Sequence, residues 1–239
     1  MTTAFNKFVI DDTELHLDIQ SGVFVPTSTT TNLINSVKGY IKNPGKLLDL
    51  GAGCGVVGIT LSIKGLVEAP LYASDLSEGA SECILKNCDR YDVPVVIKEG
   101  SLLEPWVGEK FDIIVDDISG VAEEAAKLSP WFENVPCQTG IDGSDLTIQV
   151  LQNANNHLNE NGLLFFPVIS FSGVGKILDA ARQNFTNVEL LQRVEWPLPK
   201  DMYEHVSTLQ RIKQEGNIQF EEKFGMILCF TDIYVAFKK

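Results

Sequence analysis

An acidic residue followed by three glycines at alternate positions is the part of this sequence best suited to ligand chemistry. Asp49 precedes Gly51, Gly53 and Gly55, and glycines let a backbone turn approach a bound molecule closely. The apolar run before the motif is typical of a buried parallel strand, and the apolar residues from Val56 onward have helical spacing. The free N–H groups at such a helix start favour a carboxylate or phosphate. The pattern therefore predicts a polar ligand on this loop.

Asp49 decides between the ligands that fit the loop. Gly53, Gly55 and Gly58 also match the GxGxxG fingerprint, so a nicotinamide or flavin site is one alternative, and a glycine turn without a ligand is another. A carboxylate ahead of the first glycine would repel a pyrophosphate and attract an amino group. S-adenosylmethionine carries an amino group, a carboxylate and a sulfonium cation. The sequence therefore favours this nucleoside.

A second acidic residue stands where a ribose is expected. Asp75 follows Gly55 by 20 residues, at the end of a strand predicted for residues 70–74. This is the span of a helix, a turn and a strand before an acidic residue that binds ribose hydroxyls. The alternative is a helix N-cap, since a helical stretch follows at 79–91.

Two adjacent aspartates follow the strand predicted for residues 111–115. Open parallel sheets bind ligands beyond the carboxyl ends of their strands, so a reacting group is expected beside Asp116 or Asp117. Neighbours on an extended chain point to opposite faces, so only one aspartate should face the ligand. Asp117 can accept a hydrogen bond or a proton from an amine or hydroxyl. The alternative is that Asp117 touches only the cofactor or a loop.

Composition limits the class of protein. The 239 residues are 44% hydrophobic, which suits one α/β domain with a full core. The net charge of −13 disfavours a nucleic acid partner. Five cysteines form no CxxC pair and their number is odd, which favours a cytoplasmic protein over a disulfide framework. The sequence has no membrane-span pattern and no histidine and cysteine spacing typical of a metal site.

The remaining elements are predicted from apolar periodicity and turn residues. A hairpin is expected within residues 1–25, with Asp11 and Asp12 in its turn, and residues 121–145 form a long connection. A helical segment is expected at 199–224, before the last strand or strand pair. Further strands are expected at 94–98, 162–168, 188–195 and 225–237, and further helices at 31–41, 146–158 and 174–185.

Together these motifs resemble the HemK-like methyltransferases, a branch of the methyltransferase small-domain family within class I. Residues 23–30, VFVPTSTT, resemble the segment before the family's core, and LLDLGAGCGVVGI resembles its glycine motif. GSLLEP at 100–105 resembles the family's GDLFEP, TGIDGSD at 139–145 its GGEDGLD, and Asn87 stands at a family asparagine. The likeness spans about residues 20–190.

The resemblance implies S-adenosylmethionine as cofactor, S-adenosylhomocysteine as product and a set of cofactor contacts. It also implies a doubly wound α/β fold of one domain, residues 1–239, with a mainly parallel seven-stranded sheet and an antiparallel last strand. The implied cofactor-binding residues are Pro26, Thr30, Asp49, Gly51, Ala52, Gly53, Cys54, Gly55, Asp75, Leu76, Ser101, Leu102 and Asp117.

The chain departs from the family at its NPPY motif. FDIIVDDISG at 111–120 places Asp117 at the asparagine position, where the family holds the planar amide of a glutamine. Asp117 lacks the NH2 donor that grips an amide carbonyl. We therefore expect methyl transfer to an N or O nucleophile of a protein side chain or a small molecule. Asp117 is the catalytic candidate, and Ser119, Trp131, Phe132 and Tyr203 are candidates for the acceptor pocket. The alternatives are a non-catalytic cofactor-binding regulatory module and a nicotinamide-dependent oxidoreductase.

Overall fold

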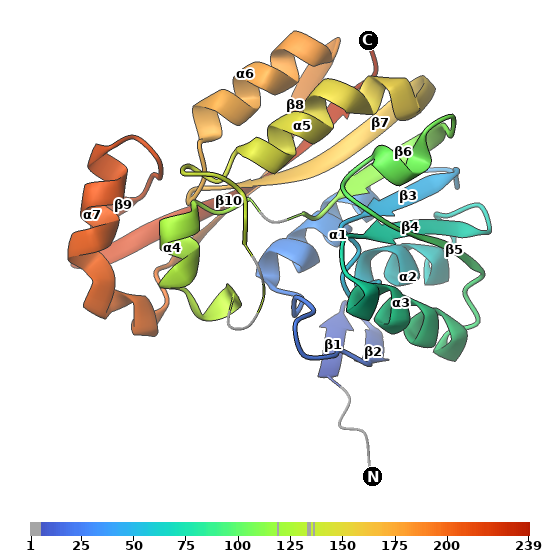
Figure 1. Cartoon of the computed structure of the whole chain (residues 1–239), viewed down its shortest axis with the longest axis horizontal. Coiled ribbons are helices and arrows are strands. Elements are labelled where there is room, and N and C mark those ends of the chain that lie inside the picture. The colour runs from blue at the N-terminus through green and yellow to red at the C-terminus, as the bar shows by residue number, and fades with distance from the viewer. Residues whose placement is uncertain (1–5, 119, 133–134, 136) are drawn as a thin grey trace.

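A twisted, mainly parallel sheet forms the centre of the computed structural model, which describes residues 6–118, 120–132, 135 and 137–239 (Figure 1). The strand order is β5-β4-β3-β6-β7-β10-β8, with β9 beside β10. The five strands β5, β4, β3, β6 and β7 are parallel, and β10 runs antiparallel to both β7 and β8. The strands are β3 (Leu47–Leu50), β4 (Leu71–Asp75), β5 (Val95–Glu99), β6 (Phe111–Asp116), β7 (Leu158–Ile169), β8 (Asn187–Pro197), β9 (Glu221–Lys223) and β10 (Met226–Phe237). The predicted doubly wound sheet with an antiparallel last strand is confirmed, and β9 adds one short strand.

Helices cover both faces of the sheet. One face carries α1 (Ser28–Tyr40), α2 (Val56–Ile63) and α3 (Glu78–Arg90), whose buried residues share one apolar cluster. The other carries α5 (Asp145–Asn153) and α6 (Val174–Asn184), which pack in a second cluster. The two clusters follow from the apolar stripe that each helix presents to the sheet.

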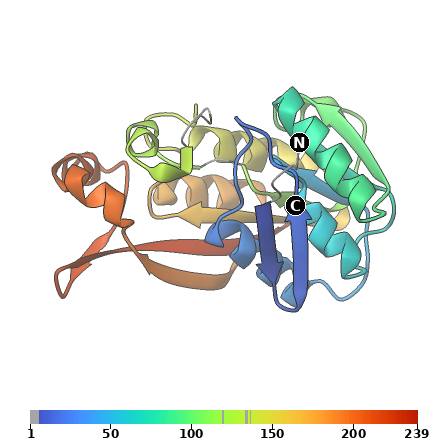
Figure 2. The same ribbon diagram turned by 90° about the horizontal axis from the view of Figure 1, so that it is seen from below.

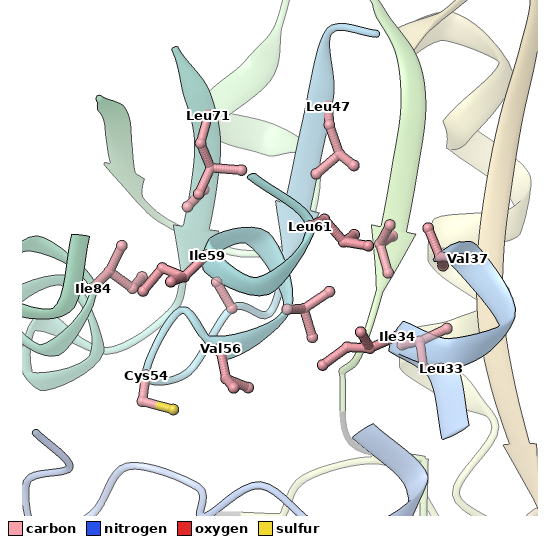
Figure 3. Close-up of a cluster of buried hydrophobic side chains, with 14 of the residues drawn as sticks. Leu33, Ile34, Val37, Leu47, Cys54, Val56, Ile59, Leu61, Leu71 and Ile84 are labelled. Atoms are coloured by element: carbon pink, nitrogen blue, oxygen red, sulfur yellow. The ribbon is translucent and has the colours of Figure 1, made fainter. Parts of the chain in front are cut away.

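Helix α2 holds the glycine loop against the core. In Figure 3 its residues Val56, Ile59 and Leu61 lie between side chains of α1 and of α3, including Val37 and Ile84. All five are at most 2% exposed, and burying each such side chain contributes about 1.5–3 kcal/mol. The loop before α2 is therefore attached to a helix whose first six residues, Val56 to Leu61, are all buried.

The N-terminal hairpin is present, as predicted, and is shorter than expected. Its strands are β1 (Asn6–Ile10) and β2 (Thr13–Leu17), and residues 18–27 then run as a loop to α1. Asn87, fully buried in α3, donates from its amide to the carbonyls of Asp18 and Cys54, both at 2.9 Å, and accepts from the Asp18 N–H at 2.7 Å. One side chain thus connects the hairpin, the glycine loop and α3.

Four elements differ from the sequence predictions. Helix α1 begins at Ser28, three residues before the predicted start, because Thr27 is its N-cap. Helix α4 (Glu123–Lys127) lies inside the connection predicted at 121–145, and α5 ends at Asn153, followed by the 3-10 turn η3 (Ala154–His157). Strand β7 begins four residues earlier than predicted, because an irregularity in its pairing with β6 accommodates the turn residues around Asn161, whose φ is 62°. Two further 3-10 turns are η1 (Glu104–Trp106) and η2 (Pro130–Phe132).

The predicted helical insertion precedes the last strand. It consists of η4 (Lys200–His205) and α7 (Val206–Gln214), which pack on a third apolar cluster through Met202, Leu209 and Ile212. Figure 2 shows this orange-to-red segment at one end of the molecule, which the long strands β8 and β10 also reach. Among the described residues, no helix combines the length and apolar character needed to cross a membrane.

Candidate active site

A cavity of about 840 Å³ opens at the carboxyl ends of β3, β4 and β6. The chain moves outward from β3 to β5 and then crosses to β6 on the other side of β3, so the cavity lies at the switch point of the sheet. Its volume falls within the range of about 300–1,000 Å³ that is usual for ligand pockets.

Most of the predicted site residues lie on the wall of this cavity. The lining residues that the sequence predicted are Pro26, Thr30, Gly51, Ala52, Gly53, Cys54, Asp75, Leu76, Ser101, Leu102, Asp117, Trp131 and Phe132. Asp49, Gly55 and Tyr203 do not line it. Ser119 lies outside the described residues.

The glycine loop is shaped for close approach. Gly51 has a φ of 70°, and a Cβ atom there would lie 2.5 Å from the Cγ2 atom of Ile118. Gly53 has a φ of 55° and faces open space, with only the Phe24 carbonyl within 4 Å of a Cβ position. Both positions require a residue without a side chain, for backbone geometry and, at Gly51, for space. The loop is therefore an open cradle.

Asp75 connects this cradle to α3. One carboxylate oxygen accepts from the Gly53 N–H at 3.0 Å, and the other accepts from the Ser77 N–H at 3.1 Å. The N-cap of α3 is Ser77, whose hydroxyl accepts from the Ala80 N–H at 3.1 Å, so Asp75 is not the helix cap. A carboxylate has about four acceptor positions, so two remain for hydroxyl groups of a ligand.

Asp49 is fully buried behind the loop. Its Oδ2 accepts from the Gly58 N–H at 2.8 Å, whereas its Oδ1 has no partner among the described residues. Burial raises the pKa of this carboxyl to about 7; the Gly58 hydrogen bond opposes the rise, and the charges of Asp117 and Asp75 add to it. Because Asp49 does not line the cavity, direct contact with an ammonium group stays a prediction.

Only Asp117 of the aspartate pair reaches the cavity. Asp116 is fully buried, and its carboxylate accepts from the Ile118 N–H at 3.1 Å. Burial raises the pKa of both carboxyls to about 7, and for Asp117 a hydrogen bond with the Thr30 side chain opposes the rise. The first turn of α1 therefore positions the carboxyl that follows β6.

One end of the cavity has an apolar wall of partly exposed side chains. Leu76 is 74% exposed, and Leu102 has a strained φ of 49°. Ser101, which is polar, and Ala80, which is buried, also line the cavity. Exposed apolar surface in a cavity favours a flat, apolar ligand face such as a nucleobase, which would remove that surface from water.

The opposite end is aromatic, and the sequence revealed only part of it. Trp131 and Phe132 line the cavity as predicted, together with Phe24 and Trp196, which were not identified. Trp196 lies near the end of β8, far from the glycine loop in sequence, so no local spacing indicated its position. The Tyr203 hydroxyl instead accepts from the Ile227 N–H at 3.3 Å.

The residues around the cavity fit S-adenosylmethionine. The open glycine cradle suits its methionine part, the free acceptor positions of Asp75 suit a ribose, and the wall at Leu76 and Leu102 suits a base. The unpaired Oδ1 of Asp49 adds negative character behind the cradle. Cys54 is no nucleophile here, because burial raises the pKa of its thiol to about 12.

Known proteins with similar sequences and folds are methyltransferases. The model of the methyltransferase small domain family matches residues 15–117. A release factor glutamine methyltransferase of Geobacter sulfurreducens is 26% identical over 154 residues, which cover 61% of this chain and 53% of that protein. The chain spans about half the length of the curated relatives it matches.

Two solved structures illustrate the shared fold. The ribosomal protein L11 methylase of Lactobacillus delbrueckii has a TM-score of 0.55 at 17% identity, covering 89% of this chain and 80% of that chain. The 16S rRNA N2 G1207 methyltransferase of T. thermophilus, in complex with AdoMet and guanosine, has a TM-score of 0.62 at 14% identity. The match covers 98% of this chain and 50% of that chain. The chain therefore shares the fold of these class I methyltransferases. Within that fold, residues 15–117 are the part that is similar to the methyltransferase small domain family.

Proposed function

We propose that this protein transfers a methyl group from S-adenosylmethionine to an N or O nucleophile of a protein side chain or small molecule. The observation that carries the proposal is the position of Asp117, on the wall of the same cavity as the glycine cradle and Asp75. A carboxylate there lines one cavity together with the proposed cofactor-binding residues and the aromatic side chains. The whole chain is proposed to act as one methyltransferase domain.

The cofactor would be held by residues from three loops. Asp75 would accept hydrogen bonds from the ribose hydroxyls, Leu76, Ser101 and Leu102 would surround the base, and Gly51 to Gly55 would cradle the methionine part. Pro26 and Thr30 would close the cavity from the side of α1. The bound cofactor supplies the electrophilic methyl group. The protein's part is alignment of the nucleophile and removal of a proton.

Asp117 is proposed to orient the nucleophile and accept its proton. An ionised carboxylate accepts hydrogen bonds and donates none. It can therefore pair with an amine or hydroxyl, but it lacks the donor that an amide carbonyl needs. For this reason the glutamine acceptor named for the relatives is not proposed for this chain. The free thiols of all five cysteines support a cytoplasmic location within the same proposal.

Charge argues against two other ligand classes. Asp49, Asp75 and Asp117 surround the glycine loop, where the pyrophosphate of a nicotinamide cofactor would have to lie. A nucleic acid acceptor is also disfavoured by the net charge of −13, although proteins of this fold include an rRNA methyltransferase. A regulatory module that binds the cofactor without transfer is the remaining alternative, and turnover distinguishes it.

Calorimetry with the purified protein tests the proposal. S-adenosylmethionine and S-adenosylhomocysteine should both bind, and Asp75→Ala should weaken both by about tenfold or more, because charge-assisted hydrogen bonds are lost. Asp179→Ala, at an exposed position in α6, is the matched control and should bind normally. If neither nucleoside binds the unmodified protein, the proposed function is wrong.

A further inference from the structure

Four aromatic side chains line the same cavity as Asp117. Phe24, Trp131, Phe132 and Trp196 line it and are each partly exposed. The rings of Phe24 and Phe132 lie 5.4 Å apart, and those of Trp131 and Trp196 lie 5.5 Å apart at 85°. These four side chains, here called the aromatic wall, present apolar ring surface that a ligand would cover favourably.

The aromatic wall is held in place by buried neighbours. Both tryptophan rings pack against the ring of Phe171, which is fully buried. The distance between ring centroids is 6.2 Å for Trp131 and 6.0 Å for Trp196. The Trp196 indole N–H donates to the Thr231 hydroxyl at 3.0 Å, and Thr231 lies 3.3 Å from the Thr29 hydroxyl. The ring of Trp196 is therefore fixed relative to the first turn of α1, next to the Thr30 side chain that contacts Asp117. Such a wall binds a rigid planar group without reordering itself first.

The charge of the cavity is negative. Among the described residues that line it, the charged side chains are Asp75 and Asp117, and none is lysine, arginine or histidine. The proposed function assigns the free acceptor positions of Asp75 to the ribose, so Asp117 is the carboxylate that remains for an acceptor group. An anionic acceptor would be repelled, and a cationic one would be paired.

We propose that the methyl acceptor is a small amine on a planar aromatic body. Its ring would contact the aromatic wall, and its nitrogen would lie against Asp117. This inference rests on the proposed function and names the substrate class for it. A protein side chain is disfavoured because the aromatic wall offers area for a broad ring system next to the reacting position, which a linear side chain would leave uncovered.

The proton and the bonds balance without another reactant. The acceptor's ammonium group gives one proton to the Asp117 carboxylate and becomes a neutral amine. The nitrogen lone pair then forms the bond to the methyl carbon as the carbon–sulfur bond breaks and its electron pair stays on sulfur. The methylated amine leaves as a cation, and Asp117 returns its proton to water.

Three probes with the same ring and different charges test this inference by binding alone. Tryptamine, tryptophol and indole-3-propionate carry an amine, a hydroxyl and a carboxylate on an indole. Calorimetry is done with protein saturated with S-adenosylhomocysteine, so that no transfer occurs. Tryptamine should bind about tenfold or more tightly than tryptophol, because a charge-assisted hydrogen bond is the stronger one, and indole-3-propionate should not bind.

Variants separate the carboxylate from the aromatic wall. Asp117→Asn should reduce tryptamine affinity to that of tryptophol and leave tryptophol unchanged. Trp196→Ala should weaken the binding of both probes. Retained binding of S-adenosylhomocysteine would show that this variant is folded. If Trp196→Ala does not fold, Phe24→Ala, at a loop position, tests the aromatic wall instead. Phe224→Ala is the matched aromatic control, because Phe224 is 98% exposed and does not line the cavity.

The outcomes distinguish this inference from the proposed function. If S-adenosylhomocysteine does not bind the unmodified protein, the proposed function fails. If S-adenosylhomocysteine binds but no indole probe does, only the aromatic amine inference is overturned. It is equally overturned if tryptophol or indole-3-propionate binds as tightly as tryptamine, or if Asp117→Asn and Trp196→Ala leave tryptamine affinity unchanged.

Discussion

Three carboxyl groups beside the glycine loop have a pKa of about 7 because burial disfavours their charged form. Asp49 and Asp116 are fully buried, whereas Asp117 reaches the cavity. In each case the folded protein binds a proton more tightly than the unfolded chain does. The same residues therefore affect both the stability of the protein and the chemistry of its site.

Asp49 should make the free protein less stable as pH rises. A carboxyl whose pKa is 3.8 when unfolded and about 7 when folded contributes stability below pH 4, and this contribution is lost as pH rises through 7. Asp49→Asn removes the titration and keeps an oxygen to accept from the Gly58 N–H. In urea titrations, the free energy of unfolding of Asp49→Asn minus that of the unmodified protein should be larger at pH 8 than at pH 5, because only the unmodified protein loses stability as pH rises. Asp179→Asn, at an exposed position, should show no such trend. If the difference in unfolding free energy between Asp49→Asn and the unmodified protein is equal at both pH values, the pKa of Asp49 is not raised in the folded protein.

Asp117 should control the rate of transfer. If it accepts the proton, Asp117→Asn should lower turnover of the eventual acceptor by about 10²–10⁴-fold while S-adenosylmethionine still binds. Because the pKa of Asp117 is about 7, kcat/KM of the unmodified protein should rise as pH increases through 7 and the carboxyl ionises. This rise should be absent from the Asn variant. Normal turnover by Asp117→Asn would show that the residue is not catalytic.

At the scale of elements, local patterns predicted the cofactor end of the cavity better than the acceptor end. The strand β3, the glycine loop after it, helix α2 and strand β4 lie within one short stretch of chain. Periodicity and glycine spacing therefore predicted their positions. Trp196 reaches the cavity because β10 inserts between β7 and β8, a pairing that no local pattern reveals. Helix α4 has only five residues, too few for a helical period, and β7 continues past turn residues through an irregular register.

Two glycines in helices should respond to alanine in opposite directions. In α2, a Cβ atom at Gly58 would lie 2.6 Å from a methyl carbon of buried Leu71 and 3.0 Å from the Asp49 carboxylate. Gly58→Ala should therefore destabilise the fold by about 1–3 kcal/mol through overpacking. In α1, Gly39 is exposed with nothing within 4 Å of a Cβ position, so Gly39→Ala should stabilise by about 0.5–1 kcal/mol. Thermal unfolding measures both, and equal shifts would contradict the packing described for α2.

At the scale of the whole molecule, binding and stability are linked. A ligand that binds only the folded protein stabilises it by about 2.7 kcal/mol at a free concentration of 100 times Kd. For a chain of this size the melting temperature should then rise by about 5–11 °C with S-adenosylhomocysteine. NAD and NADP at the same concentration should have no effect. A rise with either dinucleotide, and none with the nucleoside, would favour the oxidoreductase.

The two ends of the cavity come from different parts of the chain. The cradle, Asp75 and Leu102 lie within residues 15–117, and three of the four rings of the aromatic wall, Trp131, Phe132 and Trp196, lie after that segment. Phe24 lies within the segment, and Asp117 is its last residue. Exchanging Trp131, Phe132 and Trp196, or the segments that carry them, between homologues should therefore change acceptor preference and leave cofactor binding intact. Asp117, at the C-terminal end of the 15–117 segment, lines the cavity and stands between these two groups of residues in the sequence.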